Sequence, residues 1–106
     1  MINDSELKAL RKKFNDTTEL FLTNSFKALG DMNRHRIFQI LIDRPRLSAG
    51  DIAATLGISR PLASQHLKIM EQAKLFKKER VGQNKYYQLD RQNSLVKLFV
   101  SLINKS

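Results

Sequence analysis

Apolar residues recur every three or four positions through the first half of the chain, which is the spacing of one face of an α-helix. We expect a first helix over residues 4–14, with Asp4 or Ser5 as its cap. The segment Asp16-Thr17-Thr18-Glu19 has the form of a capping box and predicts a second helix, which Gly30 ends.

Two further helices are predicted from caps and stops. A third helix, capped by Asp31 or Asn33, must end before Pro45, because the residue preceding proline is pushed out of the helical conformation. Ser48-Ala49-Gly50-Asp51 is another capping box, and the short helix that it opens ends at Gly57.

A longer helix follows, with Ser59 as its cap and Pro61 in its first turn, where a missing N–H costs little. Residues 48–73 thus have a helix-turn-helix arrangement. On a helical wheel, one arc is apolar, and the other carries groups that bond base edges and phosphates. The polar arc comprises Arg60, Pro61, Ser64, Gln65, Lys68, Glu71 and Gln72.

After residue 73 the pattern changes to two β-prone runs, Leu75–Val81 and Tyr86–Leu89, around the turn segment Gly82–Lys85. This predicts a hairpin, or wing, over about 75–89. Its cations are Lys77, Lys78, Arg80 and Lys85. Such a wing can lie along a phosphate backbone, although a merely solvated hairpin is the alternative. The fold class expected is mainly α with one two-stranded hairpin, in a single domain over 1–106.

The predicted last helix, residues 93–104, carries two apolar stripes, whereas a terminal helix on a small domain needs one. We expect a twofold partner to cover the second stripe, which would also duplicate the DNA-reading helix. A terminal helix embedded within a monomer is the alternative. The expected interface residues are Leu7, Leu10, Phe14, Leu95, Leu98, Phe99 and Leu102.

Composition narrows the function. The 106 residues contain no cysteine, which excludes disulfides, thiolate metal sites and a cysteine nucleophile. No apolar run approaches the ~18 residues of a membrane span, and the start of the chain does not resemble a signal peptide. We therefore expect a cytoplasmic protein with no membrane partner.

The formal charge of +9 is uneven: residues 1–45 carry a net +2 and residues 46–106 a net +7. The excess is densest from Arg60 to Arg91. This asymmetry favours a polyanionic partner, with a solvated basic surface as the alternative.

Neither histidine suggests a metal or catalytic site. His66 falls in the apolar arc of its helix, and we expect it to pack against a neighbour or the backbone. His35 has no carboxylate or imidazole partner at a metal-ligand spacing, so a structural role is preferred. No nucleophile–base pair, phosphate loop or suggestive carboxylate pair occurs, so we expect neither an enzyme nor a cofactor.

Three segments, in order, resemble the arsenic-repressor-like (ArsR/SmtB) bacterial regulators. They are Lys27-Ala28-Leu29-Gly30-Asp31-Met32-Asn33-Arg34-His35-Arg36-Ile37, Ser59-Arg60-Pro61-Leu62-Ala63-Ser64-Gln65-His66-Leu67-Lys68 and Gly82-Gln83-Asn84-Lys85-Tyr86-Tyr87-Gln88-Leu89. The resemblance implies a winged helix-turn-helix homodimer that represses transcription, usually until an effector releases it. The effector remains unspecified.

The chain departs from this family in two places. Lys74 stands where the family usually has glycine, and because lysine resists a left-handed cap, we expect a different junction there. The family's metal-binding cysteines and its ligands on the last helix are absent, and no acidic cluster suggests a hard cation instead.

The sequence therefore predicts a repressor without metal or thiol sensing. Arg60, Ser64, Gln65 and Lys68 should face the major groove, with Pro61 beside them, and Arg80 and Lys85 should make the wing contacts. Ser59 and the helix N-terminus would hold a phosphate, and Gln65 is the expected base reader. The alternative function is a winged-helix module that binds RNA or a protein partner.

Overall fold

The computed structural model describes residues 1–15 and 17–105, apart from the side chain of Asn15. Within them the chain forms α1 (Asp4–Arg11), the 3₁₀ helix η1 (Lys12–Asn15), α2 (Thr17–Leu29), α3 (Met32–Asp43), α4 (Ala49–Leu56), α5 (Arg60–Gln72), β1 (Phe76–Val81), β2 (Asn84–Leu89) and α6 (Ser94–Asn104). The mainly helical fold with one antiparallel hairpin agrees with the prediction. No helix in the described ranges is long and apolar enough to cross a membrane.

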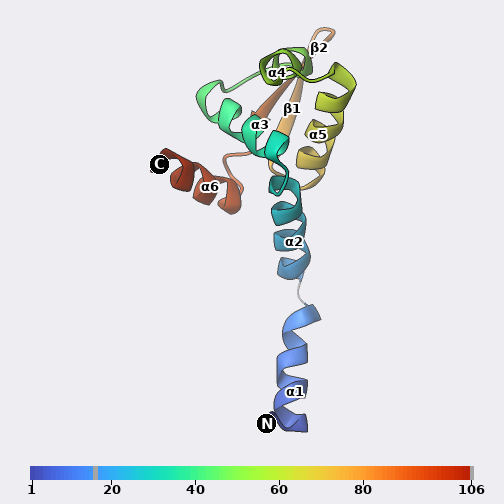
Figure 1. Ribbon diagram of the computed structural model, residues 1–106, viewed down its shortest axis with the longest axis vertical. Coiled ribbons are helices and arrows are strands. Elements are labelled where there is room, and N and C mark those ends of the chain that lie inside the picture. Colours follow the sequence, from blue (N-terminus) through green and yellow to red (C-terminus); the bar gives the residue numbers. More distant parts are fainter. Residues whose placement is uncertain (16, 106) are drawn as a thin grey trace.

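Helix α1 stands away from the other elements, and the molecule including α1 measures 59 Å along its long axis (Figure 1). The predicted cap at Asp4 or Ser5 is wrong: Oδ1 of Asn3 accepts the Glu6 N–H at 2.8 Å, so Asp4 already lies in the first turn. The α-helix also ends at Arg11 and continues as η1. The predicted capping box of α2 starts at Asp16, outside the described residues.

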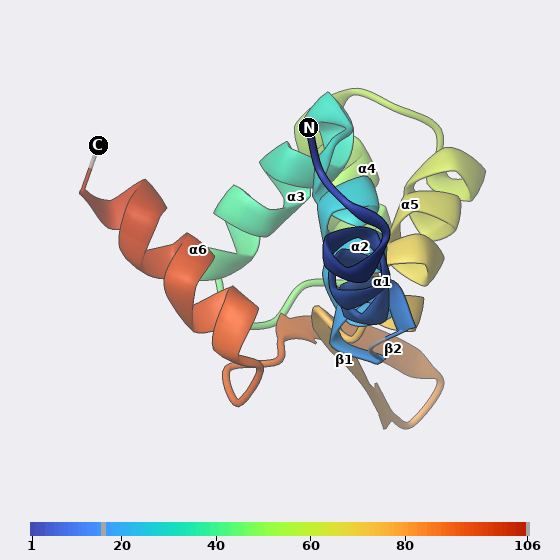
Figure 2. The same cartoon turned by 90° about the horizontal axis from the view of Figure 1, so that it is seen from below.

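Helix α3 occupies the centre of the fold. Asp31, one of its two predicted caps, accepts the Arg34 N–H at 3.1 Å, and Ile37, Phe38 and Leu41 are fully buried. Around α3 pack α2, α4, α5 and β2. Figure 2 shows α6 on the far side of α3 from α5. The core comprises Ala28, Ile37, Phe38, Leu41, Ile52, Ala53, Ala63, Leu67, Met70, Ala73, Leu75, Phe76, Tyr87, Leu89 and Val96.

The helix-turn-helix forms as its caps predict. Ser48 Oγ accepts the Asp51 N–H at 3.1 Å, and the Asp51 carboxylate accepts the Ser48 N–H at 3.4 Å. Gly57 ends α4 in the left-handed region, with φ of 68°. Ser59 Oγ then accepts the Leu62 N–H at 3.2 Å and caps α5.

The hairpin is tighter than expected. Strand β2 begins at Asn84 rather than Tyr86, because Gly82 adopts a φ of 63° and allows a two-residue turn with Gln83. Asn84 and Lys85 therefore pair in the ladder, with Lys85 directly opposite Arg80.

We expected Lys74 to avoid the left-handed conformation and so to change the junction before the wing. This expectation is wrong, because Lys74 adopts that conformation with φ of 65°. A non-glycine residue there costs about 1–2 kcal/mol. Its backbone N–H donates to the Glu71 carbonyl, and the Leu75 N–H donates to the Met70 carbonyl, both at 3.0 Å. The Lys74 carbonyl accepts the Asn93 side-chain amide at 2.9 Å. These bonds offset the strain of the left-handed lysine.

Helix α6 uses one apolar stripe within its own chain. Val96 is buried, Val100 and Ile103 pack against the core, and Phe99 meets Phe38 edge-on with ring centroids 6.2 Å apart. The stripe that was expected to face a partner is thus divided, because Phe99 faces inward while Leu98 is 52% exposed.

Candidate nucleic-acid interface

Helix α5 presents a polar face held in place by buried residues on its other side. Ala63, Leu67 and Met70 are fully buried against the core. The residues predicted to meet DNA from this helix are all exposed: Ser59, Arg60, Pro61, Ser64, Gln65 and Lys68. The face therefore carries two hydroxyls, an amide and two cations on a rigid support.

The Arg60 guanidinium and two helix N-termini place positive charge at the N-terminal end of α5. The Arg60 guanidinium lies over the first turn of α4, where a methyl group on Gly50 would sit 3.6 Å from Arg60 Cζ. The N-termini of α4 and α5 each carry partial positive charge from unpaired N–H groups. Arg60 is thus placed at the joint between the two helices, where an anion would be stabilised.

The wing places two like charges opposite one another. Arg80 and Lys85 form a cross-strand pair beside the turn, and both are exposed. In the described part of the chain neither pairs with a carboxylate, whereas Lys77 lies 3.7 Å from Asp90 and Lys78 lies 3.5 Å from Glu71. Like charges directly opposite each other are destabilising unless an anion neutralises them. The wing tip is therefore the least compensated basic part of the hairpin.

Arg46 supports the wing and was missed by sequence reasoning. Its guanidinium lies 3.5 Å from the Glu79 carboxylate and 5.1 Å from the centre of the Tyr86 ring. Next to it, Leu47 exchanges two backbone hydrogen bonds with Tyr87, at 2.8 and 3.2 Å. Because Arg46 is forty positions from Tyr86 along the chain, only the fold brings them together.

The wing and the N-terminal end of α5 lie at the same end of the molecule. Figure 1 shows the hairpin turn projecting at the end of the long axis where α5 begins. Helix α1 extends to the opposite end. The predicted DNA contacts from the two elements are thus grouped, away from the N-terminal helix.

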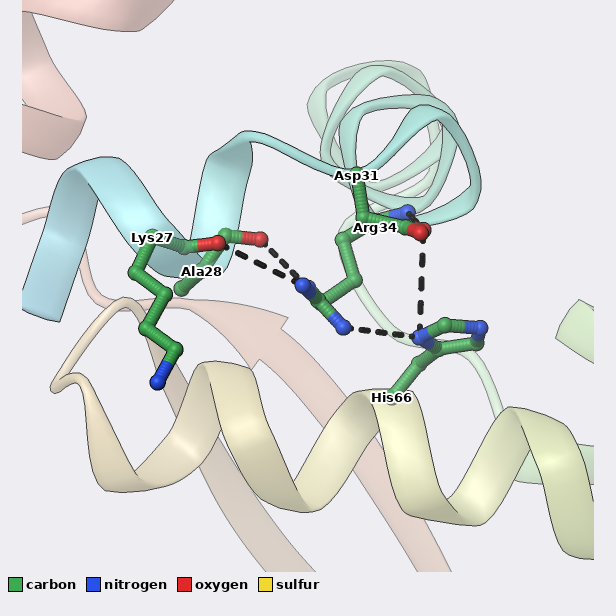
Figure 3. Close-up of polar contacts among 5 residues, drawn as sticks. All are labelled: Lys27, Ala28, Asp31, Arg34 and His66. Atoms are coloured by element: carbon green, nitrogen blue, oxygen red, sulfur yellow. Dashed lines mark hydrogen bonds and ion pairs between the residues drawn. The ribbon is translucent and has the colours of Figure 1, made fainter.

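His66 is buried, with 8% of its surface exposed, and it bonds a neighbour as expected. Its Nδ1 lies 3.2 Å from Arg34 Nη1 and 3.9 Å from the Asp31 carboxylate (Figure 3). Arg34 also donates to the carbonyls of Ala28 and Lys27, at 2.6 and 3.3 Å. Sequence reasoning assigned no role to Arg34, because its side-chain partners come from two other helices, α2 and α5.

The Arg34 backbone N–H lowers the pKa of Asp31 below its ordinary value of 3.8 by bonding the carboxylate. Burial opposes this shift, and the charge of the Arg34 guanidinium adds to it. Asp31 therefore stays ionised at neutral pH, as a helix cap beside a guanidinium.

His35 has a different environment from His66. It lines an apolar cavity of about 310 Å³ together with Phe38, Phe99 and Leu102. Among the residues that the structure describes, no group of three or more His, Cys, Asp or Glu side chains is arranged to hold a metal ion.

The predicted interface residues form no single face within one chain. On α1 and η1, Leu7 is 37% exposed, Leu10 42% and Phe14 67%. On α6, Leu98 is 52% exposed and Leu102 is 54% exposed, whereas Leu95 and Phe99 are less exposed than either.

Comparisons with known proteins agree with this geometry. A helix-turn-helix domain family matches residues 29–78. The transcriptional repressor SdpR of Bacillus subtilis is 41% identical over 69 residues, which are 65% of this chain and 76% of that protein. A transcriptional repressor SmtB homolog of Synechocystis is 39% identical over 64 residues, covering 60% of this chain and 48% of that protein.

Among solved structures, HlyU from Vibrio cholerae shares the fold, with a TM-score of 0.74 and 24% identity, over 85% of this chain and 95% of that one. The capped helix pair, the wing after it and the likeness to SdpR together establish the family. The chain belongs to the ArsR/SmtB family of winged helix-turn-helix transcription regulators.

Proposed function

We propose that this protein is a repressor that binds an inverted-repeat site in duplex DNA as a homodimer. The observation that carries the proposal is the facing pair Arg80 and Lys85, which no carboxylate in the described chain neutralises. A phosphate backbone along the wing would relieve this repulsion. The repressor role is inferred from the names of the relatives SdpR and SmtB homolog.

In this proposal α5 enters the major groove. Gln65 reads a base, because its amide can donate to and accept from adenine at the same time. Ser64 and Lys68 lie on the same exposed face and contact base edges or the nearby backbone. Ser59, Arg60 and Pro61 approach a phosphate at the helix N-terminus.

The homodimer is proposed from apolar surface on the terminal helices. Helix α1 has no buried residue, Phe14 is 67% exposed and Leu98 is 52% exposed. Contact with a second copy would remove this surface from water. A twofold dimer would also present two copies of α5 to two half-sites.

We also propose that the repressor senses neither metals nor thiols. With no cysteine and two histidines in separate environments, the chain offers no thiolate or paired imidazole for soft or borderline ions. Stoichiometric zinc, cadmium, copper or arsenite should leave DNA binding unchanged. Zinc-induced release that a His35→Ala variant abolishes would overturn this part.

Selection of bound duplexes from a random library tests the proposal. We expect an enriched inverted repeat with half-sites about 10 base pairs apart, or a multiple of that distance. Affinity should fall steeply between low and physiological salt as counterions are displaced. Failure to enrich any duplex, or stronger binding to RNA competitors, would favour the RNA-binding or protein-binding alternative.

A further inference from the structure

Arg34 joins three helices at one point. It lies in the first turn of α3, and its guanidinium donates to the carbonyls of Ala28 and Lys27 in the last turn of α2. The C-terminal end of a helix has unpaired carbonyls and partial negative charge, so a guanidinium is well suited to this position. Arg34 is thus held by α2 and α3 independently of α5.

The third contact of Arg34 reaches the DNA-reading helix. Its Nη1 lies 3.2 Å from His66 Nδ1, as Figure 3 shows. A guanidinium has no lone pair to offer, so Nδ1 must be the acceptor, and the imidazole is neutral with its proton on Nε2. His66 precedes Leu67 and follows Gln65 on α5, so the bond constrains the helix beside its expected base reader.

We propose that Arg34 is a positioning residue: by holding His66, it sets the rotation of α5 about its own axis and so controls which DNA sequence is preferred. Successive residues of a helix lie about 100° apart, so a small rotation moves Gln65 away from its base. Arg34 itself touches no DNA in this arrangement. The inference depends on the proposed DNA-binding function and deepens it.

The protonation state of His66 tests this role. The charged side chains that contact the imidazole are Arg34 and Asp31, while the Lys27 ammonium of α2 points away from it (Figure 3). A protonated imidazole carries N–H on both nitrogens, so it cannot accept from Arg34. It would instead be attracted to Asp31, whose carboxylate lies 3.9 Å from Nδ1. Acid therefore moves the attachment of α5 from Arg34 to Asp31, and DNA discrimination should fall.

The experiment compares two duplexes: one enriched by the wild-type protein and a scrambled duplex of equal length and composition. The measured quantity is the ratio of the two dissociation constants, followed from about pH 8 down to about pH 5.5. In the wild type, we expect this ratio to decrease as the pH falls. A thermal melt of each variant shows that it is folded under the conditions of the titration.

Four variants separate positioning from general stability. Arg34→Lys keeps the charge but not the planar fork, and Arg34→Ala removes both. Each should lower discrimination about tenfold at pH 8, equivalent to losing one base contact, and abolish its pH dependence. His66→Asn places an amide oxygen near the Nδ1 position, so it should keep discrimination at pH 8 and hold it constant in acid. His66→Ala should lose discrimination at every pH.

His35→Asn is the matched control, because it changes the other histidine, which lines a separate cavity. It should retain the wild-type pH profile. Binding to the scrambled duplex should change by less than about twofold in all variants, since no phosphate contact is altered.

The outcomes distinguish the two proposals. A wild-type protein that prefers neither duplex would show that the proposed function is wrong. Preference in the wild type that persists in both Arg34→Lys and His66→Ala would overturn the positioning role. A His66→Asn variant that keeps the wild-type pH dependence would overturn it as well, even if Arg34→Ala failed to fold.

Discussion

Two neighbouring residues on α5 have opposite environments. Gln65 is exposed, whereas His66 is buried against Arg34. A helix turns by about 100° per residue, so adjacent positions can serve as a reading group and as an anchor. A substitution at one position should therefore change base preference, and at the other it should change how the helix is held.

Gln65→Ala should cost about 1–3 kcal/mol at one cognate base pair and flatten the preference there, because an amide–base contact is lost. Binding titrations on a library of single-base variants of the selected site measure this effect. Gln72→Ala is the matched control, since it removes an exposed amide near the other end of the same helix. An unchanged base preference in Gln65→Ala would mean that α5 is rotated from the proposed orientation.

The carboxyl group of Asp31 makes the free energy of unfolding depend on pH. Its pKa in the folded chain lies below the ordinary 3.8 because the Arg34 N–H bonds the carboxylate. A lowered pKa means that the ionised carboxylate stabilises the fold fully above 3.8, and that this stability is lost as the pH falls through the folded value.

Asp31→Asn keeps an acceptor for the helix cap but cannot ionise. The wild type should be the more stable at neutral pH, and the difference in unfolding free energy should disappear in acid. Urea unfolding of both proteins from neutral pH to well below 3.8 measures it.

At the scale of elements, the wing combines a rigid base with a repulsive tip. The base is anchored by Leu47, Arg46 and the buried Tyr87. The tip places Arg80 opposite Lys85, which costs stability in the free protein and favours a polyanion.

Lys85→Gln should therefore have opposite effects on stability and binding. Removing the repulsion should stabilise the free protein by about 0.2–1 kcal/mol. Losing a phosphate contact should weaken binding to unrelated duplexes and reduce the salt slope by about 0.9. Thermal melts and salt titrations measure the two effects, with Lys8→Gln on α1 as the control. A salt slope equal to that of the wild type would place Lys85 away from the backbone.

Local signals predicted most elements because their causes are local. The capping box at Ser48 and Asp51, the left-handed Gly57 and the cap at Ser59 each involve residues a few positions apart. The left-handed Lys74 was not predictable in this way, because an amide 19 residues away helps to hold it. The exposed face of α5 was predicted because it depends on spacing within one helix. The attachment of α5 through Arg34 was not, because Arg34 and His66 are 32 positions apart.

At the scale of the whole molecule, the proposed DNA contacts and the N-terminal helix occupy different ends. The wing and the start of α5 lie at one end of the 59 Å axis, and α1 lies at the other (Figure 1). Exposed apolar residues on η1 and α6 include Phe14 and Leu98. The separation of the two ends would let α1 contact a second copy without covering the proposed DNA contacts.

Leu98→Glu should convert the proposed dimer to a monomer at micromolar concentration, because burying an unpaired carboxylate is strongly unfavourable. Sedimentation velocity measures the change. Val81→Glu is the matched control, because it places the same charge on an exposed apolar residue at the wing. A Leu98→Glu variant that still sediments as a dimer would show that α6 is not at the interface.

The Asn93 side chain has a consequence for how this chain can be dissected. Its Nδ2 donates a hydrogen bond to the Lys74 carbonyl, while its Oδ1 accepts hydrogen bonds from the N–H groups of Leu95 and Val96. One amide thus fastens the junction before the wing and also starts the last helix. Truncating the chain before Asn93 would loosen the wing as well as remove the helix. A shortened protein that no longer binds DNA would therefore not distinguish a lost partner from a lost hairpin, and point substitutions on α6 are the cleaner tool.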